Sequence, residues 1–458
     1  MKGPTKKDID KSLKYSIADA TANSVKNGII TNYIVPFAMF LGAGSEMIGF
    51  ITSLPELFGI FAQMSTTKII KRLKSKKYTC RIFKLISNLF WIPIMLIPFL
   101  FENGVYWLLL FLVIRMAILQ INSTAWASWI SDIVPKKIRG SFFGKRNMYA
   151  NAGSFVATTL AGWLLGMFNN AYGFIIIFSI AFIANIVSNY YLGKIIERPI
   201  KKHPKVRFSY KHFLHGIKYH SNYSNFVLYR TLMLFSIQIV APFWIVYVLK
   251  DLNIGYMWYG ISIGVFAVVN IISQKYWGKM TDRFGDKKIM FVCSFLVPFA
   301  ALIMVFITNL PQLMIERIFS GFVYAGLETA SFNYLLNASP EDDSSTFIAN
   351  YKLFAGLGSA LGPITGGILI AFFADSIMLG LGAIQALFLI SFFLRFIVAS
   401  AMVTRVHSIR VKKNIAFRNI FLKTAIVYPL ESIKNEFSYI THNIYKWEDK
   451  FKSKIHHK

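Results

Sequence analysis

The chain has 458 residues, of which 55% are hydrophobic and 16% aromatic, and its formal net charge is +29. A mean hydropathy of +0.50 excludes a soluble globular protein, because such a protein needs apolar residues on only one face of each element. An excess of Lys and Arg also suggests a nucleic-acid binder, but here it falls mainly between apolar runs on one side of the predicted topology. The charge therefore indicates membrane orientation and contact with anionic lipid headgroups, and we expect no nucleic-acid partner.

Apolar runs long enough to cross a bilayer as helices recur along the chain. We expect twelve of them, at about residues 15–41, 44–70, 82–101, 105–132, 140–168, 171–196, 223–249, 255–279, 288–308, 311–337, 345–373 and 377–404. Basic residues precede the first run, follow the last and fill alternate connections, including the loop from Lys68 to Lys84. This pattern predicts an all-α, multi-pass protein of the plasma membrane with both termini in the cytoplasm.

A basic linker containing Pro199 and Pro204 divides the chain into two halves. The predicted units are a six-helix bundle at 1–198, a cytoplasmic linker at 199–222, a second six-helix bundle at 223–404 and a basic cytoplasmic tail at 405–458. The halves repeat in sequence, and the aligned positions include Pro36 with Pro242, Gly153 with Gly358 and Gly162 with Gly367. Matches in the same order at nearly equal offsets indicate two related, pseudo-symmetric bundles.

A short charged turn joins the eighth and ninth predicted helices and reads Gly278-Lys279-Met280-Thr281-Asp282-Arg283-Phe284-Gly285-Asp286-Lys287-Lys288. Its pattern of Gly-x-x-x-Asp-Arg-x-Gly-x-Lys-Lys resembles the signature loop of the major facilitator superfamily (MFS), a family of secondary transporters. In that family the loop lies on the cytoplasmic face, between the second and third helices of a six-helix half. The resemblance covers about residues 15–404 and implies alternating access, in which two bundles rock about a central site.

The first half departs from this pattern, because Lys71 stands where the family has an acid. In the family that acid faces the start of the fifth or eleventh helix of the other half. We therefore expect a cytoplasmic gate with reversed signs, in which Lys71 and Arg72 meet three acids at the start of the eleventh helix. On the other side, Asp282 would meet Arg139. The gate and signature loop comprise Lys71, Arg72, Arg139, Gly278, Asp282, Arg283, Gly285, Lys287, Glu341, Asp342 and Asp343. The alternative is that the three acids only cap their helix.

Ionisable groups are costly in hydrocarbon, so each one within a span is a functional candidate. The resemblance implies that predicted helices 1, 4, 7 and 10 line a central cavity. The candidates for substrate or ion binding are Lys26, Asn32, Glu56, Arg115, Asn122, Gln238 and Glu328. Glu328 is the preferred proton site, as a single acid well inside its helix. For Glu56 and Arg115 the alternative is a structural ion pair, and Asp19 and Arg230 are expected near the cytoplasmic mouth.

These features predict a secondary transporter of a small solute, proton-coupled and monomeric in the bilayer. A membrane enzyme would need a clustered acid or His site at the membrane surface or a long external loop, and we expect neither. No metal site, cofactor or phosphate-binding Gly-rich motif is predicted. Lys26 and Arg115 suit an organic anion, the Asn and Gln residues suit a sugar, and an aromatic cavity with Glu328 slightly favours export of a lipophilic or cationic compound. A transporter-like sensor without transport is the remaining alternative.

Overall fold

The computed structural model describes residues 5–135, 138–197, 222–339, 344–373, 381–403 and 405–407. In chain order its helices are α1 (Lys6–Phe40), α2 (Ser45–Gln63), α3 (Thr66–Leu73), α4 (Lys76–Leu89), α5 (Trp91–Leu100), α6 (Gly104–Ile133), α7 (Arg139–Met167), α8 (Ala171–Gly193), α10 (Asn222–Gln238), α11 (Ala241–Val246), the π-helix η2 (Tyr247–Asp251), α12 (Tyr256–Phe284), α13 (Asp286–Phe306), α14 (Leu310–Ala338), α15 (Ser344–Phe373) and α16 (Ala383–Val403). In the described part, eight helical segments are long and apolar enough to cross a membrane. The other four expected spans are helical too, in α1, in α2 with α3, in α7 and in α14.

Three predicted spans are interrupted or shifted. The second breaks between α2 and α3, and the third begins at Lys76 rather than at residue 82, so residues 76–81 of the predicted basic loop are helical. The seventh breaks after Gln238 and resumes in α11 with Pro242 in its first turn. Pro lacks the backbone N–H that a helix interior needs, but it fits a first turn, where that N–H has no partner anyway.

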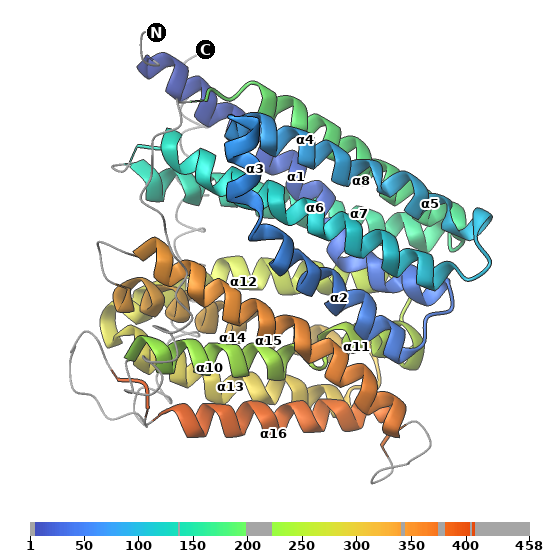
Figure 1. The fold of residues 1–458 in the computed structure, drawn as a ribbon. Helices are drawn as coiled ribbons and strands as arrows, with labels where there is room; N and C mark the ends of the chain where they lie inside the picture. Colours follow the sequence, from blue (N-terminus) through green and yellow to red (C-terminus); the bar gives the residue numbers. More distant parts are fainter. Residues whose placement is uncertain are drawn as a thin grey trace, which may run out of the picture.

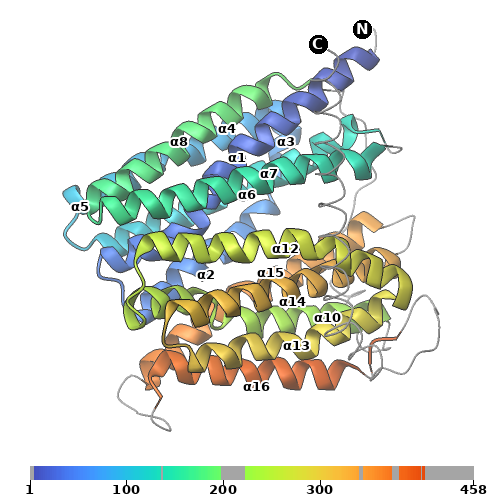
Figure 2. The same ribbon diagram turned by 180° about the vertical axis from the view of Figure 1, so that it is seen from behind.

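The helices form two bundles, α1–α8 and α10–α16, which Figures 1 and 2 show as two groups lying side by side. Within the first bundle α1 packs on α7 and α8, and within the second α12 packs on α14 and α13 on α16. The bundles meet along two lines, α2 against α15 and α7 against α12. We call the end where α1 begins and α16 ends the basic end, and the opposite end the far end (Figure 1).

Glycines let the helices of different bundles approach closely at the far end. A Cβ atom added to Gly162 of α7 would lie 2.7 Å from the carbonyl oxygen of Tyr256 in α12, and one added to Gly367 of α15 would lie 3.0 Å from that of Ser45 in α2. These two glycines are aligned in the sequence repeat. Each half therefore contributes a glycine to one of the two bundle contacts, as expected for pseudo-symmetric bundles.

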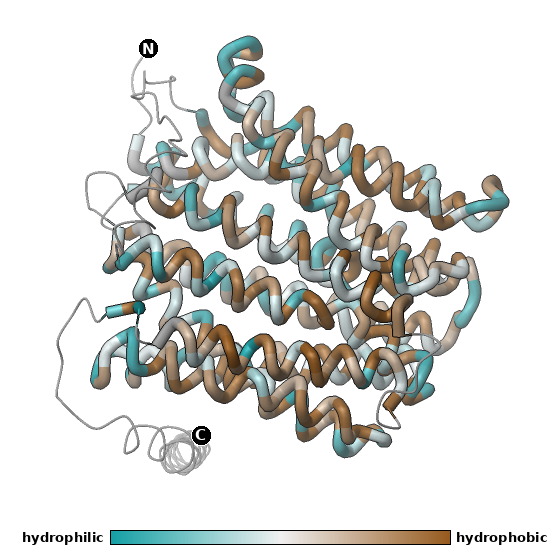
Figure 3. The backbone as a smooth tube through the Cα atoms, turned by 60° about the horizontal axis from the view of Figure 1, so that its bottom comes forward, coloured by the Kyte–Doolittle hydropathy of each residue, from teal (hydrophilic) through white to brown (hydrophobic). Residues whose placement is uncertain are grey.

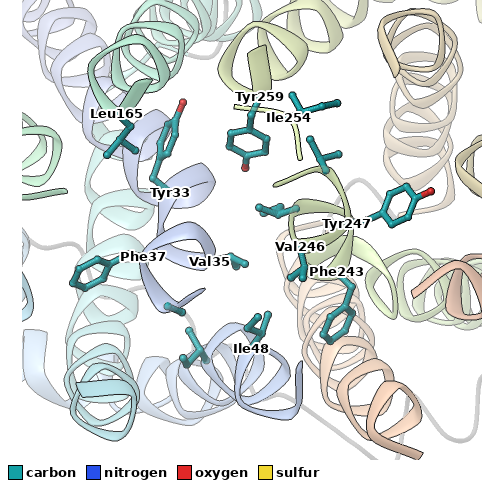
Figure 4. Packing of buried hydrophobic residues seen from close by; sticks show 14 of the residues in the cluster. Tyr33, Val35, Phe37, Ile48, Leu165, Phe243, Val246, Tyr247, Ile254 and Tyr259 are labelled. Carbon is teal, nitrogen blue, oxygen red and sulfur yellow. The ribbon is translucent and has the colours of Figure 1, made fainter. Parts of the chain in front are cut away.

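Tyrosines join the bundles beside these glycines. Tyr259 of α12 donates a hydrogen bond to the carbonyl oxygen of Asn32 in α1, at 2.8 Å, and its ring lies edge-on to Tyr33, with 5.8 Å between centroids. The Tyr33 hydroxyl donates in turn to the carbonyl oxygen of Thr158 in α7, at 2.7 Å. Figure 4 shows the two rings next to each other within a buried cluster drawn from both bundles. The contacts form an apolar closure at the far end.

The distribution of polarity fits a protein surrounded by lipid. Figure 3 shows hydrophobic residues along most of the helix lengths and hydrophilic residues gathered at the turns. Large apolar side chains such as Phe306, Ile315 and Phe372 are exposed. Exposed apolar surface on this scale needs lipid rather than water beside it.

Candidate functional site

The interior of the first bundle holds an ion pair between α1 and α4. Lys84 Nζ lies 3.0 Å from Asp19 Oδ1, and both residues are buried, at 4% and 3% exposure. Ser188 of α8 donates to the same Oδ1 at 2.6 Å, and Arg146 Nη2 of α7 lies 3.9 Å from Oδ2. Asp19 therefore connects four helices. This corrects one prediction, since Asp19 is buried within the bundle and does not line a mouth.

Lys26 and Arg115 are also buried in this bundle, at 2% and 5% exposure. The Arg115 guanidinium lies 4.5 Å above the ring of Trp91, and its Nε atom makes no hydrogen bond in the described part of the chain. No ion pair joins Arg115 to the half-buried Glu56 among the described residues, so the structure does not contain the ion pair that was the alternative to a binding role for these two residues. Asn122 accepts a hydrogen bond from the Cys80 thiol of α4 at 2.7 Å, which occupies its carbonyl within the bundle.

The second bundle places Glu328 beside Arg230. Arg230 Nη2 of α10 lies 2.7 Å from Glu328 Oε1 of α14, and the Tyr351 hydroxyl of α15 accepts from Arg230 Nε at 3.5 Å. The side chain of Arg230 is only 1% exposed, whereas that of Glu328 is 56% exposed. The carboxylate is thus accessible on one side and held by a buried cation on the other. Arg230 was expected only to shape a mouth, and the pairing was not foreseen.

A cavity of about 210 Å³ lies among α10, α11, α13, α14 and α16. Glu316 in its wall is 1% exposed and is ion-paired with the neighbouring Arg317. The Arg317 guanidinium lies 4.2 Å above the ring of Trp244, and Trp244 packs on Tyr259 of the far-end closure with 5.7 Å between ring centroids. The buried Arg395 completes the cationic part of the wall. These residues are not among the binding candidates predicted from the sequence, although an acid beside an arginine in an apolar run was a usable signal.

Two other predicted binding residues take part in helix packing near the far end. The Asn32 amide donates to the carbonyl oxygen of Gly28 at 2.7 Å and to the Thr158 hydroxyl at 3.2 Å. Gln238 is half-buried at the end of α10, beside Gly362 of α15. Asn32 is therefore held between α1 and α7.

The signature turn forms a tight joint between α12 and α13 at the basic end. Gly285 has φ of +92°, a value that side-chain-bearing residues rarely adopt. Asp286 accepts a hydrogen bond from the Asn337 amide at 2.7 Å, which ties the turn to α14. Asp282 and Arg283 are exposed, and Lys287 is half-buried. A Cβ atom built on Gly278 would lie in open space, with no atom within 4 Å apart from its chain neighbours and the backbone of its own helix.

The corresponding joint of the first half uses an ion pair. Lys76 Nζ at the start of α4 lies 2.7 Å from Asp132 Oδ2 of α6, and Glu197 accepts from the Lys76 backbone N–H at 2.6 Å. Lys71 and Arg72 are exposed at the end of α3. Their expected partners Glu341, Asp342 and Asp343, like the side chain of Arg139, lie outside the described residues, so the gate stays a prediction.

Comparisons with known proteins agree with this architecture. The sequence profile of the Major Facilitator Superfamily matches residues 20–229 and again 226–436. The multi-drug resistance efflux pump PmrA of Streptococcus pneumoniae is 23% identical over 361 residues, which is 74% of this chain and 85% of that protein.

Two solved structures share the fold. The D-xylose-proton symporter has a TM-score of 0.68 at 13% identity, covering 89% of this chain and 100% of that one. A bacterial homologue of the human lysosomal transporter Spinster, in an inward-facing and unoccupied conformation, has a TM-score of 0.67 at 14% identity, covering 88% and 98%. Both halves of the chain match one family profile, and the structure has the paired bundles of these transporters. The chain therefore belongs to the Major Facilitator Superfamily of membrane transporters.

Proposed function

We propose that the chain is a secondary active transporter that moves a small solute by alternating access, with its basic end facing the cytoplasm. The observation that carries this proposal is the pairing of Glu328 with Arg230, a partly exposed carboxylate and a buried guanidinium, in a two-bundle protein closed at the far end. A costly charged group of this kind is kept inside a membrane protein for ion or substrate passage. The orientation rests on the excess of Lys and Arg at the basic end.

We propose that the coupling ion is a proton and that Glu328 of this pair binds it. A proton that reaches the exposed side of Glu328 neutralises the carboxylate, and Arg230 then loses its ionic partner. Arg230 lies on α10 and Glu328 on α14, so a change in their attraction alters the contact between these helices. An ion pair that is broken by one proton is a two-state element of the kind that alternating access requires.

The test is solute flux in proteoliposomes with and without an imposed pH gradient. We expect Glu328→Gln to abolish the gradient dependence while leaving passive exchange of the solute intact. The matched control is Glu102→Gln, because Glu102 is exposed in the turn before α6. Gradient-driven accumulation that persists in Glu328→Gln would show that this carboxylate is not the coupling site. If no solute crosses in the wild type, the transport proposal itself fails.

Export is the proposed direction, supported by the similarity to a protein named as a multi-drug resistance efflux pump. The sequence slightly favoured a lipophilic or cationic substrate. The structure supplies an argument against a cation, because the accessible carboxylate of Glu328 is already neutralised by Arg230. A lipophilic substrate fits the aromatic interior.

A further inference from the structure

The buried interior of the first bundle contains more cations than acids. Lys26, Lys84 and Arg115 are 2%, 4% and 5% exposed, and Asp19 is the buried acid among them, at 3%. Arg146, with a side chain 15% exposed, also approaches this carboxylate. In the described part of the first bundle, one buried acid therefore faces several cations.

Both carboxylate oxygens of Asp19 already have partners. Its Oδ1 atom accepts hydrogen bonds from Lys84 and Ser188, and its Oδ2 atom faces Arg146. Lys26 lies seven residues further along the same helix, and among the described residues it makes no ion pair or hydrogen bond with Asp19. Lys26 lies on α1 and Arg115 on α6, two helices of the first bundle that contact each other. Both side chains are buried in the same bundle and both are positive.

Two like charges without an acid are unfavourable in a low-dielectric interior. Neither Lys26 nor Arg115 forms an ion pair in the described residues, and Arg115 Nε is a buried donor without a partner. The ring of Trp91 stacks on the flat face of the guanidinium, and the N–H donors lie on the edge of that group. That edge matches the two oxygens of a carboxylate or phosphate.

We propose that Lys26 and Arg115 form the binding site for the anionic group of the substrate, a carboxylate or a phosphate. This proposal rests on the proposed transport function and specifies the class of substrate that is transported. A cationic solute would meet a positive interior here.

The second bundle shows the contrast. Its buried arginines have partners within the bundle: Arg230 pairs with Glu328, Arg317 pairs with Glu316, and Arg395 donates to the carbonyl oxygen of Val297 and to the hydroxyl of Tyr324. Among the described residues, the second bundle thus holds one buried cation with only neutral partners, Arg395, whereas the first bundle holds two buried cations without an ion pair, Lys26 and Arg115. An anion bound there would lie against α1 and α6, the first and fourth spans.

The first experiment is a thermal-shift titration of the purified protein in detergent with three probes of one shape. Benzoate, benzyl alcohol and benzylammonium share a ring and differ in charge, and glycerol 3-phosphate distinguishes a phosphate site from a carboxylate site. Citrate adds a polyanion. We expect an anion to raise the melting temperature by mass action while benzyl alcohol and benzylammonium do not. Equal shifts with the neutral or cationic probe, or no shift with any anion, would overturn the proposal.

Variants locate the site. Lys26→Met and Arg115→Met each remove a charge-assisted hydrogen bond, so the apparent Kd of the stabilising anion should rise on the order of 10- to 100-fold. The control is Lys352→Met, because Lys352 is exposed on α15. Lys26→Met should also leave the melting temperature without anion unchanged or higher, since it removes repulsion. Anion binding that is unaffected in Lys26→Met and Arg115→Met would assign the site elsewhere.

Conservative variants and a binding measurement made separately from flux ensure that every outcome supports or refutes the proposal. If either Met variant fails to fold, Lys26→Arg and Arg115→Lys retain the charge and change the geometry, and they should weaken the anion less than tenfold. Binding is measured here without flux, so the two proposals can fail separately. Anion binding without transport would support the anion site and refute the proposed transport function. Flux of a solute without anion-specific stabilisation would support transport and refute the anion site.

Discussion

The strongest test of the buried charge balance is the replacement of Asp19 by Asn. The change removes the negative charge that Lys84 contacts at 3.0 Å and Arg146 approaches at 3.9 Å, while preserving the size of the side chain. Breaking a buried ion pair from one side costs about 3–5 kcal/mol, because the remaining charge has no partner. We expect Asp19→Asn to reach this range, since two buried or half-buried cations lose their acid at once.

Replacing the cation should cost less. In Lys84→Met the Asp19 carboxylate keeps the hydrogen bond from Ser188 and the neighbouring guanidinium of Arg146. The expected loss is about 1–3 kcal/mol, the cost of a buried group that loses one partner. The asymmetry between the two substitutions is the prediction, because it follows from an interior with surplus positive charge.

The assay is denaturant-induced unfolding of the purified protein in detergent micelles, followed by tryptophan fluorescence. Asp10→Asn is the control, because Asp10 is an exposed acid on the same helix α1. Equal losses for Asp19→Asn and Lys84→Met, or a larger loss for Lys84→Met, would refute the reasoning. The double variant should lose less than the sum of the single losses, as expected for residues in contact.

Two more substitutions test the far-end closure and the signature turn. Tyr259→Phe removes the hydrogen bond to the Asn32 carbonyl, worth about 0.5–1.5 kcal/mol, and should widen the distribution of spin-label distances between the bundles at the far end; an unchanged distribution would contradict a role in closure. In thermal unfolding, Gly285→Ala should lower the stability by about 1–3 kcal/mol, because Gly285 has a positive φ. Gly278 lies in open space within α12, so Gly278→Ala should be neutral or stabilising in the same measurement. Similar losses at both glycines would argue against backbone strain as the cause.

Much of the fold was readable from the sequence because a membrane imposes simple constraints. Each predicted span is mostly helical in the structure where it is described, with breaks between α2 and α3 and between α10 and α11, since backbone groups in lipid must be satisfied within the helix. The repeat was also readable, and its aligned glycines Gly162 and Gly367 occupy equivalent bundle contacts. Helix ends were less certain. Residues 76–81 resemble a basic loop by composition, yet α4 begins at Lys76, because Ser75 accepts a hydrogen bond from the backbone N–H of Tyr78 and caps the helix.

The charged residues of the interior were also predictable only in part. Periodicity and the cost of charge in hydrocarbon were enough to select Lys26, Arg115 and Glu328 as candidates. Their partners were not predictable, because an ion pair such as Arg230 with Glu328 joins residues about a hundred positions apart, and sequence spacing gives the face of a helix but not its neighbour. The sequence by itself determined which charges enter the membrane. Only the tertiary structure decided which of them are neutralised, since that depends on which helix faces pack together.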